Sequence, residues 1–202
     1  MPNWCNNTLN LRHEDPAMIE RAKKAFADGR FLDEFVPVPE ALKITSGFLA
    51  DADEQKKLEE QHEINRKTHG YPTWYEFCIG TWGTKWDVGG SDGHMVEQDA
   101  NGVVFNFDSA WAPPTGAYEH LLEQGFEIIA YYYEPGMAFC GKWENGDDDY
   151  YEYGGMSAME IADTLPDDLD ETFGISEAVA EYEAEQEEED LDIDSNNTGG
   201  KW

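Results

Sequence analysis

The amino-acid sequence predicts an α+β fold of the ferredoxin-like type, a split βαβ arrangement on one mainly antiparallel sheet with an extra C-terminal hairpin and helix. The first observation is the order of the patterned segments, which alternate between strand-like and helical spacing as β-α-β-β-α-β-β. The second is a pair of Asn-Gly dipeptides, Asn101-Gly102 and Asn145-Gly146, each between strand-like segments, as is typical of tight hairpins.

The first 29 residues predict a strand followed by a helix. Residues 4–11 alternate between two faces, and one face carries Cys5, Asn7, Leu9 and Leu11. Asp15-Pro16 is typical of a helix start, because aspartate caps free N–H groups and proline fits the first turn. Apolar residues then repeat at helical spacing until Gly29, where we expect the helix to end.

The next segments combine a connection, an insertion and a strand. Pro37 and Pro39 predict an extended, packed connection over residues 31–42. Residues 51–79 are polar and rich in helix formers, which predicts a solvent-exposed helical excursion. From Trp82 to Asp87, aromatic residues alternate with small or polar ones, and this pattern predicts a strand.

The second half of the predicted domain repeats the pattern. His94–Asp99 and Val103–Phe107 are the arms of the first hairpin. Pro113-Pro114 predicts the start of the second helix and Gly125 its end. Residues 126–133 are aromatic and β-branched, so they predict a further strand, which leads into the second hairpin.

Charge divides the chain into three parts. The whole chain has 44 acidic and 13 basic residues, a net charge of −31, and residues 143–202 hold 21 of the acids and one base. We therefore expect a ferredoxin-like domain over 1–155, a short helical extension over 156–176 and a flexible acidic tail over 177–202. This charge repels phosphate backbones and anionic membranes, so we expect neither direct nucleic-acid binding nor membrane binding. The charge favours a basic partner.

The sequence predicts a protein of the reduced cytoplasm. No apolar stretch approaches the roughly 20 residues that cross a bilayer. The first residues lack the basic and apolar regions of a signal peptide. Cys5, Cys78 and Cys140 are widely spaced and form no CxxC motif, so we expect free, buried thiols.

Four ordered blocks carry a resemblance to a known family. They are residues 4–7 (WCNN), 82–87 (WGTKWD), 110–114 (AWAPP) and 133–136 (YEPG), the last running into 139–141 (FCG). Together they resemble the YubB-type ferredoxin-like proteins, small proteins of unknown function carried mainly by phages and plasmids, over about residues 2–150. The resemblance implies a ferredoxin-like fold and a mobile-element source, with the host cell cytoplasm as the location. It implies no established activity.

Enzyme motifs are missing from the sequence. It contains no GxSxG, HExxH, GxxxxGK[ST] or GxGxxG pattern, and its acidic runs lack the alternate-ligand spacing of a calcium loop. We therefore predict no catalytic residues, no metal and no cofactor. Enzymatic activity stays undecided at this point, with its absence favoured.

A candidate pocket lies in the predicted strand over residues 82–87. Lys85 and Asp87 are two apart, so on a strand they share a face, and Asp108 and Trp111 end the neighbouring strand. One interpretation is an aromatic pocket for a small ligand or a partner's side chain, formed by Lys85, Trp86, Asp87, Asp108 and Trp111. The other is a structural Lys–Asp ion pair beside a tryptophan-rich core.

The acidic residues of the last third are the second candidate site. The predicted partner-binding residues are Glu144, Asp147, Asp148, Asp149, Glu152, Asp167, Asp168, Asp170, Glu187, Glu188, Glu189 and Asp190. The favoured hypothesis is a non-enzymatic accessory protein of a phage or mobile element. It would bind a basic host protein or the nucleic-acid-binding groove of a host complex, and inhibit a host defence or nucleic-acid-processing complex by DNA mimicry. The alternatives are a small-ligand-binding or enzymatic domain that uses the candidate pocket, and an acidic scaffold or assembly protein. The oligomeric state is left open.

Overall fold

The protein is described by a computed structural model covering residues 2–197, with side chains for all of these except residue 97 and residues 187–197. The strands are β1 (Trp4–Arg12), β2 (His94–Asp99), β3 (Gly102–Ala110), β4 (Glu127–Glu134), β5 (Phe139–Glu144) and β6 (Asp147–Glu152). The α-helices are α1 (Pro16–Ala27), α2 (Phe31–Phe35), α3 (Ala52–His69), α4 (Trp74–Phe77), α5 (Thr115–Glu123), α6 (Ala158–Thr164), α7 (Asp167–Phe173) and α8 (Ile175–Asn197). The shorter turns are η1 (Glu40–Leu42), η2 (Cys78–Trp82) and η3 (Gly90–Asp92). The predicted α+β class is confirmed.

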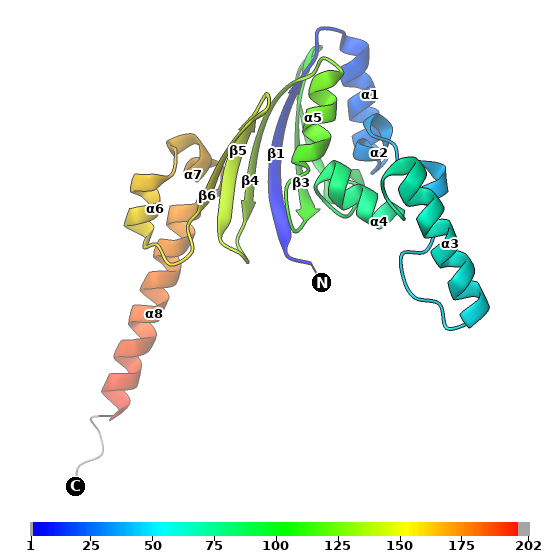
Figure 1. Ribbon diagram of the computed structural model, residues 1–202. Coiled ribbons are helices and arrows are strands. Elements are labelled where there is room, and N and C mark those ends of the chain that lie inside the picture. Colours follow the sequence, from blue (N-terminus) through cyan, green and yellow to red (C-terminus); the bar gives the residue numbers. More distant parts are fainter. Residues whose placement is uncertain (1, 198–202) are drawn as a thin grey trace.

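The strands form one sheet in the order β2-β3-β1-β4-β5-β6. Every neighbouring pair is antiparallel, and β1 pairs with β3 on one side and β4 on the other. Figure 1 shows α1, α2 and α5 on one face of this sheet and α6, α7 and the start of α8 on the opposite face. Both predicted hairpins are present, as β2–β3 and β5–β6.

The first strand and helix follow the sequence pattern. Along β1, Cys5, Asn7, Leu9 and Leu11 are buried on one face, as predicted. The Asp15 carboxylate accepts a hydrogen bond from the backbone N–H of Ala17 and caps α1. Since both the alternation and the cap are local features, they are readable from the sequence alone.

Two hydrophobic clusters occupy the two faces of the sheet. The larger packs one face against α1, α2 and α5, and includes Leu9, Phe26 and Phe105. The rings of Phe26 and Phe105 are stacked, with centroids 4.1 Å apart. The smaller cluster lies on the opposite face and joins Cys140 of β5 to residues of α6 and α7 and to Ile175, at the start of α8. The last third of the described chain therefore packs on the sheet.

The strand predicted over residues 82–87 is absent, and this prediction was wrong. The chain ends a π turn at Trp82 and continues through bends to η3. The indole Nε1–H of Trp82 donates to the carbonyl oxygen of Val36, and the Thr84 hydroxyl donates to the carbonyl of Ala110. Each side chain is anchored to a different part of the molecule. The alternation of residue types over residues 82–87 therefore reflects separate tertiary contacts and does not indicate the two faces of a β-strand.

Residues 31–42 were predicted to be an extended connection, and the structure corrects this prediction at both ends. Residues 31–35 form helix α2, and residues 40–42 form the turn η1. The two prolines lie after α2 ends, so they do not interrupt it. Phe31 and Leu32 are buried in the larger cluster, and this burial stabilises a helix too short to form in isolation.

The acidic tail begins in a different state from the one predicted. Residues 175–197 form α8, where the charge pattern predicts a flexible tail from residue 177. Ile175 is fully buried in the smaller cluster, and Asp170 accepts a hydrogen bond from the backbone N–H of Ser176. A Glu183 oxygen accepts a hydrogen bond from the backbone N–H of Ala158 at the start of α6. Tertiary contacts at the start of the helix thus oppose the repulsion between its carboxylates.

Candidate functional site

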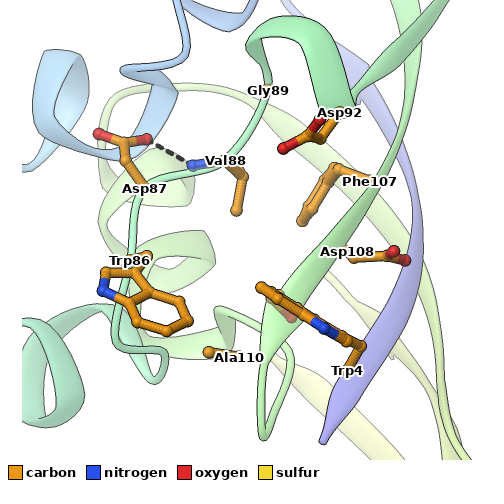
Figure 2. Close-up of a pocket in the computed structure, with 10 residues that line it drawn as sticks. Trp4, Trp86, Asp87, Val88, Gly89, Asp92, Phe107, Asp108 and Ala110 are labelled. Carbon is orange, nitrogen blue, oxygen red and sulfur yellow. Dashed lines mark hydrogen bonds between the residues drawn. The ribbon is translucent and has the colours of Figure 1, made fainter. Parts of the chain in front are cut away.

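A cavity of about 510 Å³ lies between the start of β1, the end of β3 and the loop that leads into η3. Its apolar lining consists of Trp4, Trp86, Val88, Phe107 and Ala110. The other lining residues are Asp87, Gly89, Asp92, Asp108 and Ser109. Figure 2 shows the two indole rings and Ala110 on one side of this cavity, with Val88 and Phe107 opposite them.

Two tryptophans form the open aromatic wall of the cavity. Trp4 is the first residue of β1 and pairs with Ala110 of β3. Its ring lies against that of Trp86, with centroids 5.9 Å apart and planes at 38°. Trp4 is 45% exposed and Trp86 39% exposed, so both rings contribute apolar surface that the described residues leave uncovered.

Two exposed carboxylates stand at the edge of the cavity. Asp92 is the last residue of η3, and Asp108 lies on β3. The Asp108 carboxylate accepts a 2.6 Å hydrogen bond from the Asn6 amide, which orients it, and Asp92 accepts a 3.1 Å hydrogen bond from the Ser91 hydroxyl. Within the described part of the chain neither carboxylate forms an ion pair, and Figure 2 shows Asp92 turned into the cavity and Asp108 turned toward the side of β1.

Asp87 has a different role from that of the other two aspartates. Its carboxylate accepts hydrogen bonds from the backbone N–H groups of Leu32 at 2.7 Å, Asp33 at 2.9 Å and Val88 at 2.8 Å. Figure 2 shows the carboxylate turned away from the cavity, toward Val88 N–H. Burial raises the pKa of Asp87 above its usual value, and the three backbone hydrogen bonds act in the opposite direction. Asp87 caps the N-terminus of α2 across a long sequence separation.

The five residues of the predicted pocket divide between two places. Trp86, Asp87 and Asp108 line the cavity. Lys85 does not line the cavity. Its Nζ lies 4.6 Å from the ring centroid of Trp86 and 5.5 Å from the ring centroids of Tyr75 and Trp111. Trp111 lines a separate hollow of about 340 Å³. The predicted Lys85–Asp87 ion pair is therefore absent, because these residues do not lie on a strand.

The sequence reasoning missed Trp4 and Asp92 as lining residues. Trp4 is the one aromatic residue on a face of β1 that otherwise carries polar residues such as Asn6 and Thr8. An exposed tryptophan on a polar strand face was the sequence feature that could have indicated a binding site. Asp92 lies in the glycine-rich segment 88–94, which the sequence indicates only as a turn. Its position at the cavity depends on packing of that loop on α1, where Gly89 approaches the backbone of Phe26.

A second, more polar hollow continues from the cavity. It has a volume of about 490 Å³ and shares Asp92, Phe107 and Asp108 with the first. Its remaining lining is mainly amide, hydroxyl and imidazole side chains or short loop residues, and includes Asn6, Thr8, Ser91, His94, Asn106 and Thr172. The two hollows together run from the indole rings along β1 and β3 to the end of α7.

The predicted acidic surface stands on ordered elements. Glu144 ends β5, residues 147–149 and 152 lie on the edge strand β6, and residues 167, 168 and 170 lie on α7. The side chains of Glu187, Glu188, Glu189 and Asp190 lie outside the described residues. The β5–β6 hairpin and α7 lie next to each other on the same side of the sheet. The ammonium Nζ of Lys142 on β5 lies 3.0 Å from a Glu144 oxygen and 3.6 Å from an Asp168 oxygen on α7.

Several of these acids form internal contacts. Asp168 accepts a hydrogen bond from the Tyr131 hydroxyl, which lowers the pKa of Asp168. Asp148 accepts a 2.7 Å hydrogen bond from the Tyr132 hydroxyl, and Asp170 is bonded to Ser176. In contrast, Asp147, Asp149 and Asp167 have exposed side chains. Within residues 2–186 the structure gives these three no hydrogen-bond or ion-pair partner, so their carboxylates are available to an external cation.

The remaining reactive groups are arranged as structural elements. Burial raises the pKa of the Cys5, Cys78 and Cys140 thiols to about 12, so they stay protonated at neutral pH.

Among the described residues no group of three or more His, Cys, Asp or Glu side chains is placed to hold a metal ion. No helix in the same residues is long and apolar enough to cross a membrane.

No family model and no curated protein matches this chain. A solved structure, protein api92 from Yersinia pseudotuberculosis, of the family DUF1281, is similar to it. The two share 15% sequence identity with a TM-score of 0.41, over 77% of this chain and 99% of that chain. A likeness at this TM-score carries no argument about family or function.

Proposed function

We propose that this chain is a non-enzymatic accessory protein of a phage or other mobile element, and that its terminal third binds a basic surface of a host protein. The observation that carries this proposal is the position of the acidic side chains. They stand on β6, which is an edge strand of the sheet, and on α7, which packs against the sheet, within a segment of net charge −20. Because these carboxylates are held in place, a partner binds them without first ordering a flexible chain.

The ferredoxin-like assignment is part of this proposal. Read from β4, the central strands follow the order β4-β1-β3-β2, with α1 and α5 on one face, which supports a split βαβ arrangement. The strands β5 and β6 extend the sheet beyond it. The YubB-type relationship rests on the four sequence blocks. Their convergence supports it, since Trp4 pairs with Ala110 and contacts Trp86, and Asn6 pairs with Tyr133.

DNA mimicry is the inhibitory mechanism that we favour. Duplex DNA carries one negative charge per roughly 1.7 Å along its axis, so a mimic needs closely spaced carboxylates on a rigid frame. Asp147 and Asp149 project from one face of the paired strand β6, about 7 Å apart along it, whereas Asp148 projects from the other face, where it accepts a hydrogen bond from Tyr132. The fixed positions of Asp147 and Asp149, together with the acids of α7, support mimicry over the scaffold alternative. The alternative pocket around Lys85, Asp87 and Trp111 has less support, because Lys85 and Trp111 do not line the cavity.

The proposal is tested by capture of host proteins on the immobilised full-length chain. At about 0.1 M salt we expect a basic nucleic-acid-binding protein to be retained, and at about 1 M salt we expect its release, because the Debye length falls from about 10 Å to 3 Å. Duplex DNA should displace the identified, purified partner, since both compete for the same basic groove.

Two matched variants sharpen this test. Asp147→Asn with Asp149→Asn should weaken binding of the purified partner about tenfold. Glu60→Gln with Glu119→Gln removes the same charge from exposed positions on α3 and α5 and should leave binding unchanged. Equal effects of the two variants would contradict a defined binding surface, and failure of DNA to compete would contradict mimicry.

A further inference from the structure

We propose that the cavity between Trp4, Trp86, Asp92 and Asp108 binds the guanidinium group of an arginine side chain on a partner protein. This inference deepens the proposed function, because it names the chemical group that a basic partner inserts. It concerns a site separate from the acidic hairpin, although the hollow that adjoins the cavity reaches the end of α7.

The cavity combines the two kinds of group that bind organic cations. The exposed faces of Trp4 and Trp86 attract a cation through the negative potential above their rings, and tryptophan is the strongest such partner among the aromatic residues. Asp92 and Asp108 both line the cavity: Figure 2 shows the Asp92 carboxylate turned into it, whereas the Asp108 carboxylate is turned toward Asn6, at the adjoining polar hollow. A guanidinium group stacks on a ring and donates paired hydrogen bonds to a carboxylate at the same time.

Among the described residues, no ion pair compensates the negative charge of Asp92 and Asp108. Asp108 is oriented by the Asn6 amide, a neutral donor, and Asp92 by a hydroxyl. The nearest cation described at these rings is Lys85, whose Nζ lies 4.6 Å from the centroid of Trp86. Lys85 does not line the cavity, and it already illustrates that this tryptophan accepts a cation on its ring. Trp4 has no such cation among the described residues.

The shape of the cavity favours arginine of a polypeptide over a small free cation. Its apolar lining residues Val88, Phe107 and Ala110 offer contact to the methylene stem of a long side chain. The adjoining polar hollow shares both aspartates and presents amide and hydroxyl groups, including the amide of Asn106 and the hydroxyl of Thr8. Such groups are suited to hydrogen bonds with a peptide backbone that flanks the inserted arginine. Lysine fits less well, because its ammonium group is compact and more strongly hydrated.

The test uses the full-length protein and three capped pentapeptides, Gly-Gly-Xaa-Gly-Gly, in which Xaa is arginine, citrulline or lysine. Citrulline has nearly the shape of arginine but no charge. Binding is followed by calorimetry and by the change in tryptophan fluorescence. We expect the arginine peptide to bind at least about tenfold more tightly than the citrulline peptide, and more tightly than the lysine peptide.

Variants tie the binding to the named residues. Asp92→Asn with Asp108→Asn should weaken the arginine peptide about tenfold, and Trp4→Leu should weaken it several-fold with thermal unfolding near that of the unmodified protein. If Trp4→Leu lowers stability, Trp4→Phe provides the second variant, since it keeps an aromatic ring of smaller negative potential. Glu60→Gln with Glu119→Gln is the matched control for charge and should leave peptide binding unchanged.

Four results would overturn the inference. They are equal affinity for the arginine and citrulline peptides, equal affinity for arginine and lysine, no effect of the double aspartate variant, and equally tight binding of free guanidinium ion. The last result would assign the cavity to a small cation. The proposed function fails separately, if the chain retains no basic protein while still binding the arginine peptide.

Discussion

Replacement of Asp87 tests the main difference between the sequence pattern and the structure. The sequence pattern favours a Lys85–Asp87 pair on a strand, whereas the structure uses the Asp87 carboxylate to cap α2. The variants are Asp87→Ala and Asp87→Asn, each with and without Lys85→Met. They separate an ion pair from a cap, because only an ion pair makes the effects at the two positions depend on each other.

The magnitude follows from the three hydrogen bonds. Asp87→Ala leaves the backbone N–H groups of Leu32, Asp33 and Val88 without their acceptor, at about 1 kcal/mol each, so the free energy of unfolding should fall by about 3 kcal/mol. In Asp87→Asn one oxygen still serves Leu32 and Val88, while an amide group replaces the oxygen that serves Asp33. We expect a loss of about 1–2 kcal/mol, because a neutral amide also avoids part of the burial penalty that raises the pKa of Asp87.

The assay is urea unfolding at neutral pH, followed by far-ultraviolet circular dichroism. The coupling free energy between Lys85→Met and Asp87→Asn should lie within about 0.5 kcal/mol of zero, since Lys85 contacts the rings of Tyr75, Trp86 and Trp111 instead. A coupling of about 1 kcal/mol or more would refute the capping argument in favour of an ion pair. So would an Asp87→Ala variant as stable as the unmodified protein.

Three further predictions concern the frame of the two sites. Gly89 has a φ of +100°, and a Cβ there would lie 2.2 Å from the Phe26 carbonyl oxygen, so Gly89→Ala should lower the free energy of unfolding by more than about 3 kcal/mol. Gly155 has a φ of +82° with open space around it, so Gly155→Ala should lower the free energy of unfolding by about 1 kcal/mol. Equal losses for the two variants in urea unfolding would contradict this steric argument. The hydrogen bond from Tyr131 lowers the folded-state pKa of Asp168, so this carboxylate stabilises the fold above its unfolded-state pKa, and the stabilisation is lost as the pH falls through the folded-state pKa. The melting temperature of Asp168→Asn should therefore fall less than that of the unmodified protein between about pH 5 and pH 3. Equal falls in the two melting temperatures would contradict this prediction. Because the net charge is −31, raising sodium chloride from about 0.05 M to 0.5 M should raise the melting temperature through screening, and a fall would indicate that ion pairs outweigh repulsion.

Local patterns predicted the elements that depend on neighbouring residues. The alternation of β1, the Asp15 cap of α1 and the Asn-Gly hairpins were all readable, because each is specified within a few residues. The segment 82–87 was misread because its side chains are anchored to Val36 and Ala110, which lie far away in the sequence. Similarly, α8 was predicted as a tail because the burial of its first residue depends on the opposite face of the sheet.

For the candidate site, the sequence supplied three of the lining residues and the sign of the charge. It indicated Trp86, Asp87 and Asp108 through their proximity in a predicted sheet, although the strand itself is absent. It could not indicate that Asp87 turns away to α2 or that Trp4 and Asp92 complete the walls. Those positions depend on the approach of a loop to α1 and on the pairing of β1 with β3.

The sequence by itself determined the α+β class, the order of most elements and the concentration of negative charge in the last third, since periodicity, caps and composition are local properties of the chain. Only the tertiary structure decided where that charge stands and which residues meet at the cavity. Strand pairing and packing on the two faces of one sheet join residues more than a hundred positions apart, as with Asn6 and Asp108. Such contacts follow from the burial of side chains that no single segment covers alone.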